Sequence, residues 1–254
     1  MTKAKSKTQA KSRSATRRKS KGRTASSATP GWTWGRILRL ARNVMLGLIG
    51  AVLALVVLFS FVNPVMTPYM IAESWRQGGI QRAWVDLDDV SPELARSVVA
   101  AEDANFCRHW GFDLKAIRAA IEEGSGRGAS TISQQVVKNV FLWQGRSWPR
   151  KALEALLTPV VEAVWTKRRI LEVYLNVAET GPGIFGVEAA ARHYFGRSAA
   201  ELTPRQAALI AAILPDPKGR NPARPSNFLR ARATSILEGA ATIRADGRAD
   251  CFQH

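Results

Sequence analysis

Two adjacent carboxylates, Glu102 and Asp103, end an apolar helical pattern and are followed by the aromatic residues Phe106 and Trp110. A carboxylate held against apolar surface is harder to ionise, so its pKa rises toward the range that suits general acid–base catalysis. A solvated pair at the end of a helix is the simpler interpretation of these residues taken alone. The pair is therefore a candidate proton-transfer site, and the choice between the two interpretations depends on the neighbouring sequence.

A glycine-rich segment from Gly124 to Gly128 leads into a polar helix that begins near Ser130 and Thr131. Glycines let the backbone approach a ligand closely, and the start of a helix offers unpaired N–H groups to an anion. The segment is not a P-loop, because no Gly-Lys-Ser/Thr step is present. An ordinary amphipathic helix would explain the polar face, but uncharged amides beside a cation favour a polyhydroxy, phosphorylated ligand. The residues of this face are Gln135, Lys138 and Asn139, and Gln134 precedes them.

A basic cluster follows, made of Arg146, Arg150 and Lys151, with Glu154 four residues after Arg150. Arg150 and Glu154 could form a helical ion pair worth a few tenths of a kcal/mol. The same cluster could neutralise a phosphate-bearing leaving group. The sequence has neither a Cys/His metal-binding cluster nor a Gly-x-Ser-x-Gly motif.

Taken together, residues 91–221 resemble the glycosyltransferase domain that polymerises bacterial peptidoglycan, in its single-domain, membrane-anchored form. No Ser-x-x-Lys occurs, so we expect no peptide-crosslinking domain in this chain. Ala129 and Ser133 differ from the commonest Gly and Thr of that family, which we interpret as mild variation. The matching motifs are Glu102-Asp103-x-x-Phe106-x-x-His109-x-Gly111, Gly128 to Asn139, Arg150-Lys151-x-x-Glu154, Ile170-Leu171-Glu172-x-Tyr174-Leu175-Asn176, and Gly186 through Tyr194-Phe195-Gly196.

The resemblance implies a mainly α, lysozyme-like fold and a lipid-linked disaccharide-pentapeptide substrate. The growing glycan strand would be the donor, and the 4-hydroxyl of a new lipid-linked unit would attack it with inversion, releasing polyprenyl pyrophosphate. By match to the family, Glu102 would be the general base and Glu154 the second catalytic carboxylate. Substrate contacts would come from Ser130, Gln134, Gln135, Lys138, Arg146, Arg150 and Lys151.

The role of Glu154 is the open point of this scheme. Beside a pyrophosphate a bare carboxylate would repel the substrate, so it must hold a divalent cation, orient a cationic side chain, or carry a proton. We favour the first two jointly, with Mg²⁺ or Mn²⁺ as the cation near Glu154. No other cofactor is expected.

A basic segment and an apolar segment precede the elements that position these residues. The chain has 254 residues and a formal net charge of +17, of which residues 1–43 carry thirteen Lys or Arg and no acidic residue. Residues 44–62 are uncharged, and nineteen residues suffice to cross a hydrocarbon core of about 30 Å. A cleaved signal peptide is the alternative, but its apolar region is usually shorter. We expect a single-pass anchor in the cytoplasmic (inner) membrane, with the N-terminus inside and the remainder on the outer face.

We expect a basic disordered tail at 1–43, a transmembrane helix at 44–62 and a connector at 63–90. The glycosyltransferase domain would cover 91–240, followed by a tail at 241–254. Helical periodicity predicts helices from Ser91 to Glu102, from Ser130 to about Leu142, and over 149–166 and 167–178; a further helix begins after Thr203 and ends before Pro215. No stretch alternates convincingly as a strand.

Glu172, Asn176 and Glu179 form a polar stripe that we assign to structure. Cys107 and Cys251 could pair in an oxidising compartment, and two unpaired thiols explain the sequence equally well.

Two other functions fit parts of the sequence. A lysozyme-like or lytic enzyme cutting the same glycan would need no pyrophosphate site, so the basic cluster argues against it. A membrane-tethered binding protein would use the basic tail for nucleic acid or anionic lipid, but the tail lies across the membrane from the motifs. We therefore expect the lipid-linked precursor, the glycan strand and the membrane as partners, with cell-wall synthesis or division proteins besides, and no nucleic acid.

Overall fold

The computed structural model describes residues 34–122, 130–145 and 147–253. The chain divides into two compact units, Met1–Leu46 and Gly47–His254. Residues 1–33 of the tail expected at 1–43, the glycine-rich segment and Arg146 lie outside the described residues, whereas residues 34–43 of that tail are helical.

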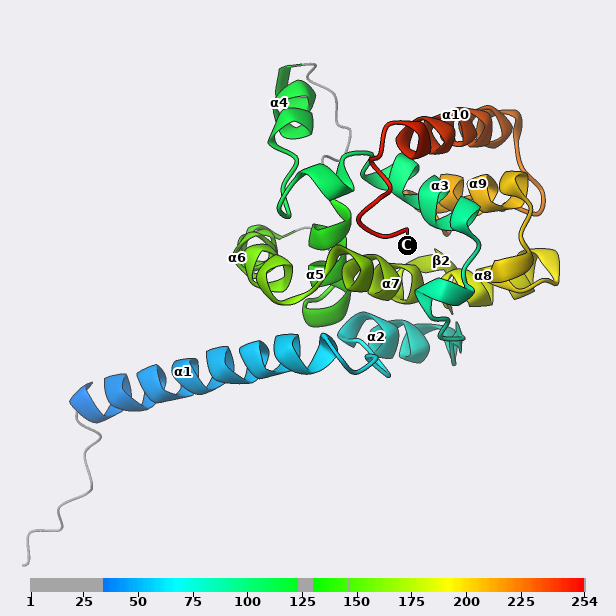
Figure 1. Ribbon diagram of the computed structural model, residues 1–254. Helices are drawn as coiled ribbons and strands as arrows, with labels where there is room; N and C mark the ends of the chain where they lie inside the picture. Colours follow the sequence, from blue (N-terminus) through cyan, green and yellow to red (C-terminus); the bar gives the residue numbers. More distant parts are fainter. Residues whose placement is uncertain (1–33, 123–129, 146, 254) are drawn as a thin grey trace, which may run out of the picture. The chain divides into compact units, whose positions relative to one another are not determined.

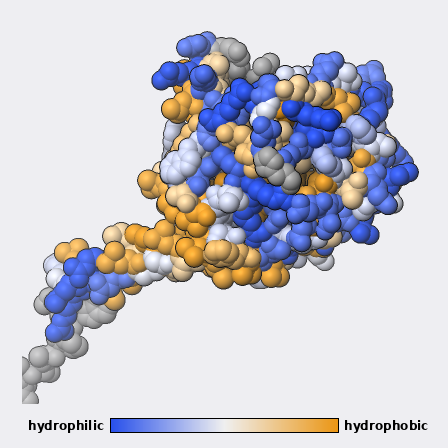
Figure 2. All heavy atoms as spheres, viewed as in Figure 1, coloured by the Kyte–Doolittle hydropathy of each residue, from blue (hydrophilic) through white to orange (hydrophobic). Residues whose placement is uncertain are grey.

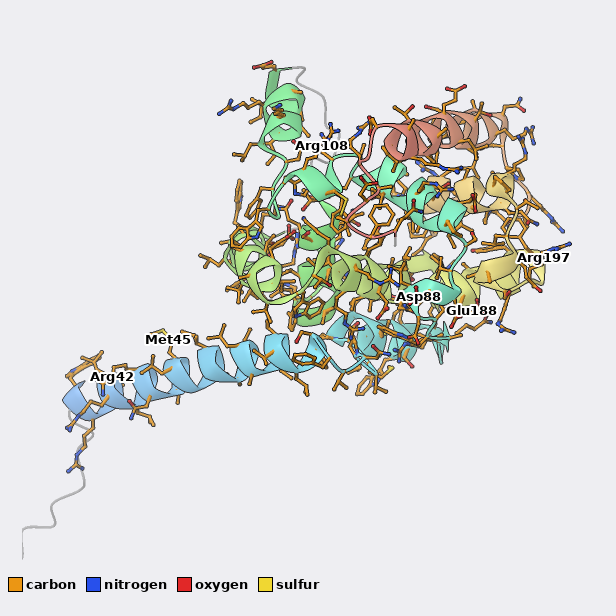
Figure 3. The ribbon with its side chains drawn as sticks, viewed as in Figure 1. Arg42, Met45, Asp88, Arg108, Glu188 and Arg197 are labelled. Carbon is orange, nitrogen blue, oxygen red and sulfur yellow. A yellow bond between two sulfur atoms is a disulfide. The ribbon has the colours of Figure 1, made fainter. Side chains whose placement is uncertain are left out.

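Helix α1 (Trp34–Phe59) is long and apolar enough to cross a membrane, judged by length and composition. Its 26 residues span about 39 Å, more than a hydrocarbon core requires. Arg42 is its last charged residue, and Figure 3 shows Arg42 and Met45 pointing away from the helix axis. The helix begins at Trp34, earlier than the expected Val44, because the basic lead-in also forms helical turns.

Side chains of the second unit satisfy the carbonyl groups at the end of α1. Such groups have no partner within a helix and need one elsewhere. The Trp165 indole N–H donates to the Val56 carbonyl at 2.7 Å. The Arg169 guanidinium donates to the Phe59 carbonyl at 3.0 and 3.1 Å and to the Val62 carbonyl at 3.0 Å. These hydrogen bonds hold the C-terminal end of α1 in place.

Apolar side chains gather around this end of α1 and along the helix that follows it (Figure 2). The exposed ones include Phe61, Val65, Ile71 and Trp75. An apolar surface of this kind on a soluble domain usually marks an interaction site with a protein or a membrane.

The second unit is mainly α, as the sequence predicts. Helices α3, α9 and α10 pack against one another, and α5 packs against both α6 and α7 (Figure 1). The buried core includes Leu94, Phe106, Ile132, Tyr174 and Phe185. The helices are α2 (Pro68–Gln77), α3 (Pro92–Glu102), α4 (Leu114–Glu122), α5 (Ile132–Phe141), α6 (Trp148–Val164), α7 (Lys167–Val177), α8 (Val187–Phe195), α9 (Pro204–Ile213) and α10 (Asn227–Ala245). Short 3₁₀ helices lie at Leu87–Asp89 (η1), Phe106–Arg108 (η2) and Ala199–Glu201 (η3).

Capping residues place the helix starts where the sequence predicts them. The Ser91 hydroxyl accepts a hydrogen bond from the Leu94 amide at 3.2 Å, and Pro92 occupies the first turn of α3. Thr203 and Gln206 form the predicted capping box of α9. These caps fix the registers of α3 and α9, and with them the place of Glu102 at the end of α3.

The absence of strands was wrongly predicted. A small sheet has the order β1-β3-β2, in which β1 (Gln81–Arg82) runs parallel to β3 (Ile184–Phe185) and β2 (Glu179–Gly181) runs antiparallel to it. Gln81 pairs with Ile184 and Arg82 with Phe185. Strands of two or three residues are too short to show an alternating pattern, so periodicity could not reveal them.

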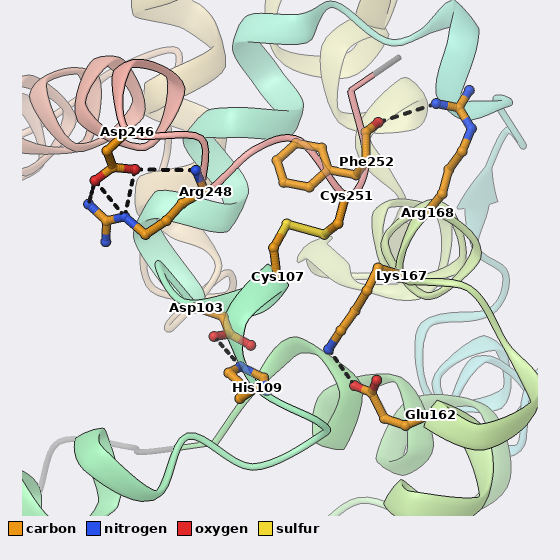
Figure 4. The surroundings of a disulfide bond; sticks show 10 residues. All are labelled: Asp103, Cys107, His109, Glu162, Lys167, Arg168, Asp246, Arg248, Cys251 and Phe252. Atoms are coloured by element: carbon orange, nitrogen blue, oxygen red, sulfur yellow. Dashed lines mark hydrogen bonds and ion pairs between the residues drawn. A yellow bond between two sulfur atoms is a disulfide. The ribbon is translucent and has the colours of Figure 1, made fainter.

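Regular structure extends into the expected connector and into the expected C-terminal tail. The stretch 63–90 contains α2, β1 and η1, and α10 runs to Ala245 inside the expected C-terminal tail. Beyond α10, Cys251 forms a disulfide with Cys107, which settles the pairing that the sequence left open (Figure 4). Phe252 is buried, with its ring 6.5 Å from that of Phe106. The chain end is therefore part of the core.

Candidate functional site

Glu102 lies at the last turn of α3 and faces α5. The Gln135 side chain donates from Nε2 to Glu102 Oε2 at 2.8 Å. Burial raises the pKa of Glu102 above its ordinary value, while the Gln135 hydrogen bond and the positive charges of Arg232 and Lys138 oppose that rise. Glu102 is thus a carboxylate in a poorly solvated place with compensating charge nearby, as a general base requires.

Asp103, the second carboxylate of the pair, is buried and holds the local backbone. One oxygen lies 2.8 Å from His109 Nε2 (Figure 4). The other accepts a hydrogen bond from the Ile132 amide at 3.0 Å. Because Ile132 opens α5, Asp103 ties the end of α3 to the start of α5. Asp103 therefore fixes the position of Glu102 relative to the polar residues of α5.

Gly111 completes this junction. Its carbonyl accepts a hydrogen bond from the Thr131 hydroxyl at 2.7 Å. Its φ is +85°, and a Cβ there would lie 2.7 Å from Thr158 Cγ2. Only glycine meets both demands, so the last residue of the first motif has a steric explanation.

Lys138 lies one turn after Gln135 on α5 and lines a pocket of about 320 Å³. Burial lowers the pKa of Lys138, and the carboxylates of Glu154 and Glu102 oppose that change. Lys138 thus lies within the field of both expected catalytic carboxylates. It forms no ion pair with any residue that the structure describes. Its charge is available to an anionic ligand.

Glu154 is buried and forms ion pairs with two cationic side chains, those of Arg150 and Lys151. Arg150 Nη1 donates to Glu154 Oε2 at 2.7 Å, and Lys151 Nζ donates to Oε1. Lys151 also reaches the Ser130 hydroxyl at 3.3 Å, and Arg150 Nε donates to the Gly145 carbonyl at 2.8 Å. Arg150 and Lys151 line a separate pocket of about 270 Å³ with Ser147 and Trp148. Glu154 therefore orients cationic side chains, one of the three roles that we considered for it.

The side chains around Glu154 do not fit a protein-bound Mg²⁺ or Mn²⁺. Both of its oxygens are occupied by cationic side chains, which would repel a metal ion. Within the described ranges no group of three or more His, Cys, Asp or Glu could hold a metal ion. We derive no step through a metal.

Gln134 contributes to helix structure. Its amide oxygen accepts a hydrogen bond from the Thr131 amide at 3.1 Å, and the Thr131 hydroxyl in turn caps the Gln134 amide at 3.3 Å. This capping box opens α5. A contact between Gln134 and substrate stays a prediction, as does any role of Arg146, which lies outside the described residues.

The pocket beside Lys138 also contains residues for which the sequence predicted no contact with substrate. Tyr174 donates from its hydroxyl to Gln135 Oε1 at 3.3 Å, which fixes the orientation of the Gln135 amide. Glu179, assigned above to structure, lines the same pocket and lies 3.3 Å from Lys218 Nζ. Tyr174 lay inside a family motif, whereas Lys218 lies in a loop after α9 with no sequence signal. Tyr69, Asn139, Gln144 and Asp216 are the other polar residues of the lining.

Comparison with known proteins identifies the family. The transglycosylase family profile matches residues 70–241. A biosynthetic peptidoglycan transglycosylase of Jannaschia sp. (strain CCS1) is 62% identical over 208 residues, which cover 82% of this chain and 87% of that protein. Proteins of the same name from Rhodospirillum centenum and Caulobacter vibrioides are 49% and 46% identical, over 85% of this chain and 96% and 97% of theirs. The match over residues 70–241 and these identities show that the chain belongs to the transglycosylase family.

Proposed function

We propose that this protein is a peptidoglycan glycosyltransferase that elongates glycan strands from a lipid-linked disaccharide-pentapeptide. The observation that carries the proposal is the joining of α3 and α5 through the Glu102–Gln135 hydrogen bond, with Lys138 one turn further along α5. A base and a cation on adjacent helices are what an attacking hydroxyl and a leaving pyrophosphate require.

In the proposed reaction Glu102 takes the proton of the acceptor 4-hydroxyl as that oxygen attacks the anomeric carbon of the donor. A new glycosidic O–C bond forms as the bond from that carbon to the pyrophosphate oxygen breaks, so the anomeric centre is inverted. Gln135 holds one oxygen of Glu102 and leaves the other for the proton. Tyr174 holds Gln135 in the orientation that this needs.

The leaving pyrophosphate carries away the bonding electrons and needs positive charge. Lys138 supplies it, since it is not committed to any described carboxylate. Arg150 and Lys151 are held by Glu154 at one fixed place, so they add charge without needing to be ordered when substrate binds. Removal of Glu154 would free both cations and weaken pyrophosphate binding.

The proposed location is the inner membrane, with the catalytic unit on its outer face. Helix α1 would be the anchor, and the Arg- and Lys-rich N-terminus would remain inside. The exposed apolar residues near Ile71 and Trp75 would contact the bilayer that also holds the lipid tail of the substrate.

The purified full-length protein in detergent, given the lipid-linked precursor, should form glycan polymer. Glu102→Gln should lower kcat by about 10²- to 10⁴-fold with little change in fold. Glu93→Gln removes a carboxylate from the opposite end of the same helix and should leave the rate near that of the wild type. Polymer formation that persists in Glu102→Gln would refute the base assignment. Release of soluble fragments from cell walls, without polymer, would contradict the proposed function itself.

A further inference from the structure

The loop after α3, residues 103–111, joins the end of that helix to the start of α5, and we call it the junction loop. At its first residue, the Asp103 carboxylate accepts a hydrogen bond from the Ile132 amide at 3.0 Å. At its last residue, the Gly111 carbonyl accepts one from the Thr131 hydroxyl at 2.7 Å. Because both donors lie at the start of α5, the position of the junction loop decides how the last turn of α3 faces α5.

The middle of the junction loop is held by the C-terminal segment, which we define as residues 246–253 (Figure 4). A disulfide joins Cys107 to Cys251. The ring of Phe106 lies 6.5 Å from the ring of Phe252, and both side chains are buried. A covalent bond and an apolar contact therefore connect the two segments.

Two hydrogen bonds flank the disulfide, and both are long. Arg108 Nη2 donates to the Asp246 carbonyl at 3.3 Å, and Arg248 Nη1 donates to the Ala104 carbonyl at 3.4 Å. Both distances exceed the usual range for N–H···O hydrogen bonds. Arg108 is also exposed, so water competes for its guanidinium. The disulfide is therefore the contact that decides whether the two segments stay together.

The C-terminal segment is itself fixed to the helices behind it. Arg96 Nη1 donates to Gln253 Oε1 at 3.0 Å, and Gln253 Nε2 donates to the Pro92 carbonyl at 3.2 Å, both on α3. Arg168 of α7 donates to the Phe252 carbonyl at 3.2 Å (Figure 4). Through this segment the disulfide ties the junction loop to α3 and α7.

We propose that Cys107 and Cys251 are positioning residues of the reaction, and that the protein reaches full activity only after a disulfide-bearing oxidant has joined them. This inference rests on the proposed function, in which Glu102 must lie within reach of the acceptor hydroxyl. A displacement of about 1 Å can lower a rate about 100-fold, so release of the junction loop would slow the proton transfer. Disulfides persist in oxidising compartments, and the proposed location on the outer face of the membrane would supply one.

The oxidation is a thiol–disulfide exchange in two steps. The thiolate of one cysteine attacks the disulfide of the oxidant, which forms a mixed disulfide and releases one thiolate of the oxidant. The thiolate of the other cysteine then attacks the sulfur of the first, which forms the Cys107–Cys251 bond and releases the second thiolate of the oxidant. Two electrons pass to the oxidant, and the two protons lost by the cysteines end on its two thiolates.

The test compares the oxidised and reduced forms of the full-length protein in detergent. Dithiothreitol reduces the disulfide, and iodoacetamide then blocks the thiols in half of the sample. We expect kcat for polymerisation to fall about tenfold in both reduced samples. KM should change by less than about twofold, because the junction loop and the C-terminal segment, both described in full, contribute no residue to the lining of the pocket beside Lys138. Oxidised glutathione, added after removal of dithiothreitol, should restore kcat in the unblocked sample and leave the blocked sample slow.

Folding controls accompany each sample, with thermal melts followed by circular dichroism. Ile210→Ala removes a buried side chain from α9 and should lower the melting temperature by leaving a cavity. Its kcat should stay near that of the wild type, because Ile210 forms none of the contacts described above. Should the reduced protein melt below the assay temperature, every sample is assayed in the cold with sucrose, which favours the folded state.

Equal kcat values in the oxidised and reduced forms would overturn the inference. An equal loss of kcat in Ile210→Ala would also overturn it, since destabilisation alone would then explain the effect. The same holds if oxidised glutathione fails to restore kcat although Ellman's reagent detects no remaining thiol. If the oxidised wild-type protein makes no polymer, the proposed function fails, and that outcome is distinct from an active protein whose rate is insensitive to reduction.

Discussion

The disulfide between Cys107 and Cys251 should contribute a large share of the stability of this protein. It joins residues separated by 144 positions. In the chain-entropy description, closing a loop of that length lowers the entropy of the unfolded chain by an amount worth about 5 kcal/mol at 25 °C. Typical domains have a total stability of about 5–15 kcal/mol, so this one bond is decisive.

The perturbation is the double substitution Cys107→Ala with Cys251→Ala, which removes the bond without leaving a reactive thiol. Urea unfolding of both proteins in the same detergent, followed by tryptophan fluorescence, measures the difference. For a unit of this size we expect the midpoint to fall by about 2 M urea, taking a slope of roughly 2.5 kcal/mol per M. Reduction of the wild-type protein should reproduce the fall, and reduction of the double variant should change nothing further.

A midpoint that moves by less than about 0.3 M would refute the reasoning, since it would mean that the unfolded chain gains little freedom from losing the bond. The packing around the bond predicts a local effect as well. The Arg96 guanidinium donates to Gln253 Oε1 at 3.0 Å, and Arg168 donates to the Phe252 carbonyl at 3.2 Å. Without the bond, hydrogen exchange at residues 249–253 should rise before that of α3 does.

Two further predictions concern the junction around Glu102. Gly111→Ala should lower the free energy of unfolding by about 2–4 kcal/mol, because it combines a left-handed φ with a close approach to Thr158; Gly35→Ala, with nothing within 4 Å of its Cβ, should not be destabilising. Equal urea midpoints for the two variants would contradict this. Burial raises the folded-state pKa of Glu102, so its contribution to stability is present at low pH and is lost as the pH rises through that pKa. Glu102→Gln should therefore melt at a higher temperature than the wild type at pH 7.5, with the gap closing below about pH 4; a gap independent of pH would show that ionisation of Glu102 is not its cause.

The sequence predicted α3, α5, α6, α7 and α9 because their signals are local, but it did not predict α2, α4, α8 or α10. Ser91 with Pro92, and Thr203 with Gln206, define helix starts without reference to the rest of the fold. The short strands and the pairing of Cys107 with Cys251 depend on contacts between residues far apart in the chain, which no local pattern encodes.

Part of the candidate site stood out in the sequence for the same reason, and the roles of its residues stay predictions. Glu102 and Lys138 stood out by residue type and by the family motifs around them. The buried role of Gln134 as a cap could have been found from the Thr131-x-x-Gln134 spacing. By contrast, Lys218 comes from a loop after α9, and only the folded chain shows that it lines the pocket beside Lys138.

The chain of donors from Tyr174 through Gln135 has a consequence for turnover. Because the Tyr174 hydroxyl points at the amide oxygen, the amide nitrogen is always the end presented to Glu102. In the proposed reaction, a proton captured by Glu102 would then reside on the oxygen away from Gln135. From there it would depart with solvent as the product shifts, and the carboxylate would be ready for the next addition without rotation of any side chain.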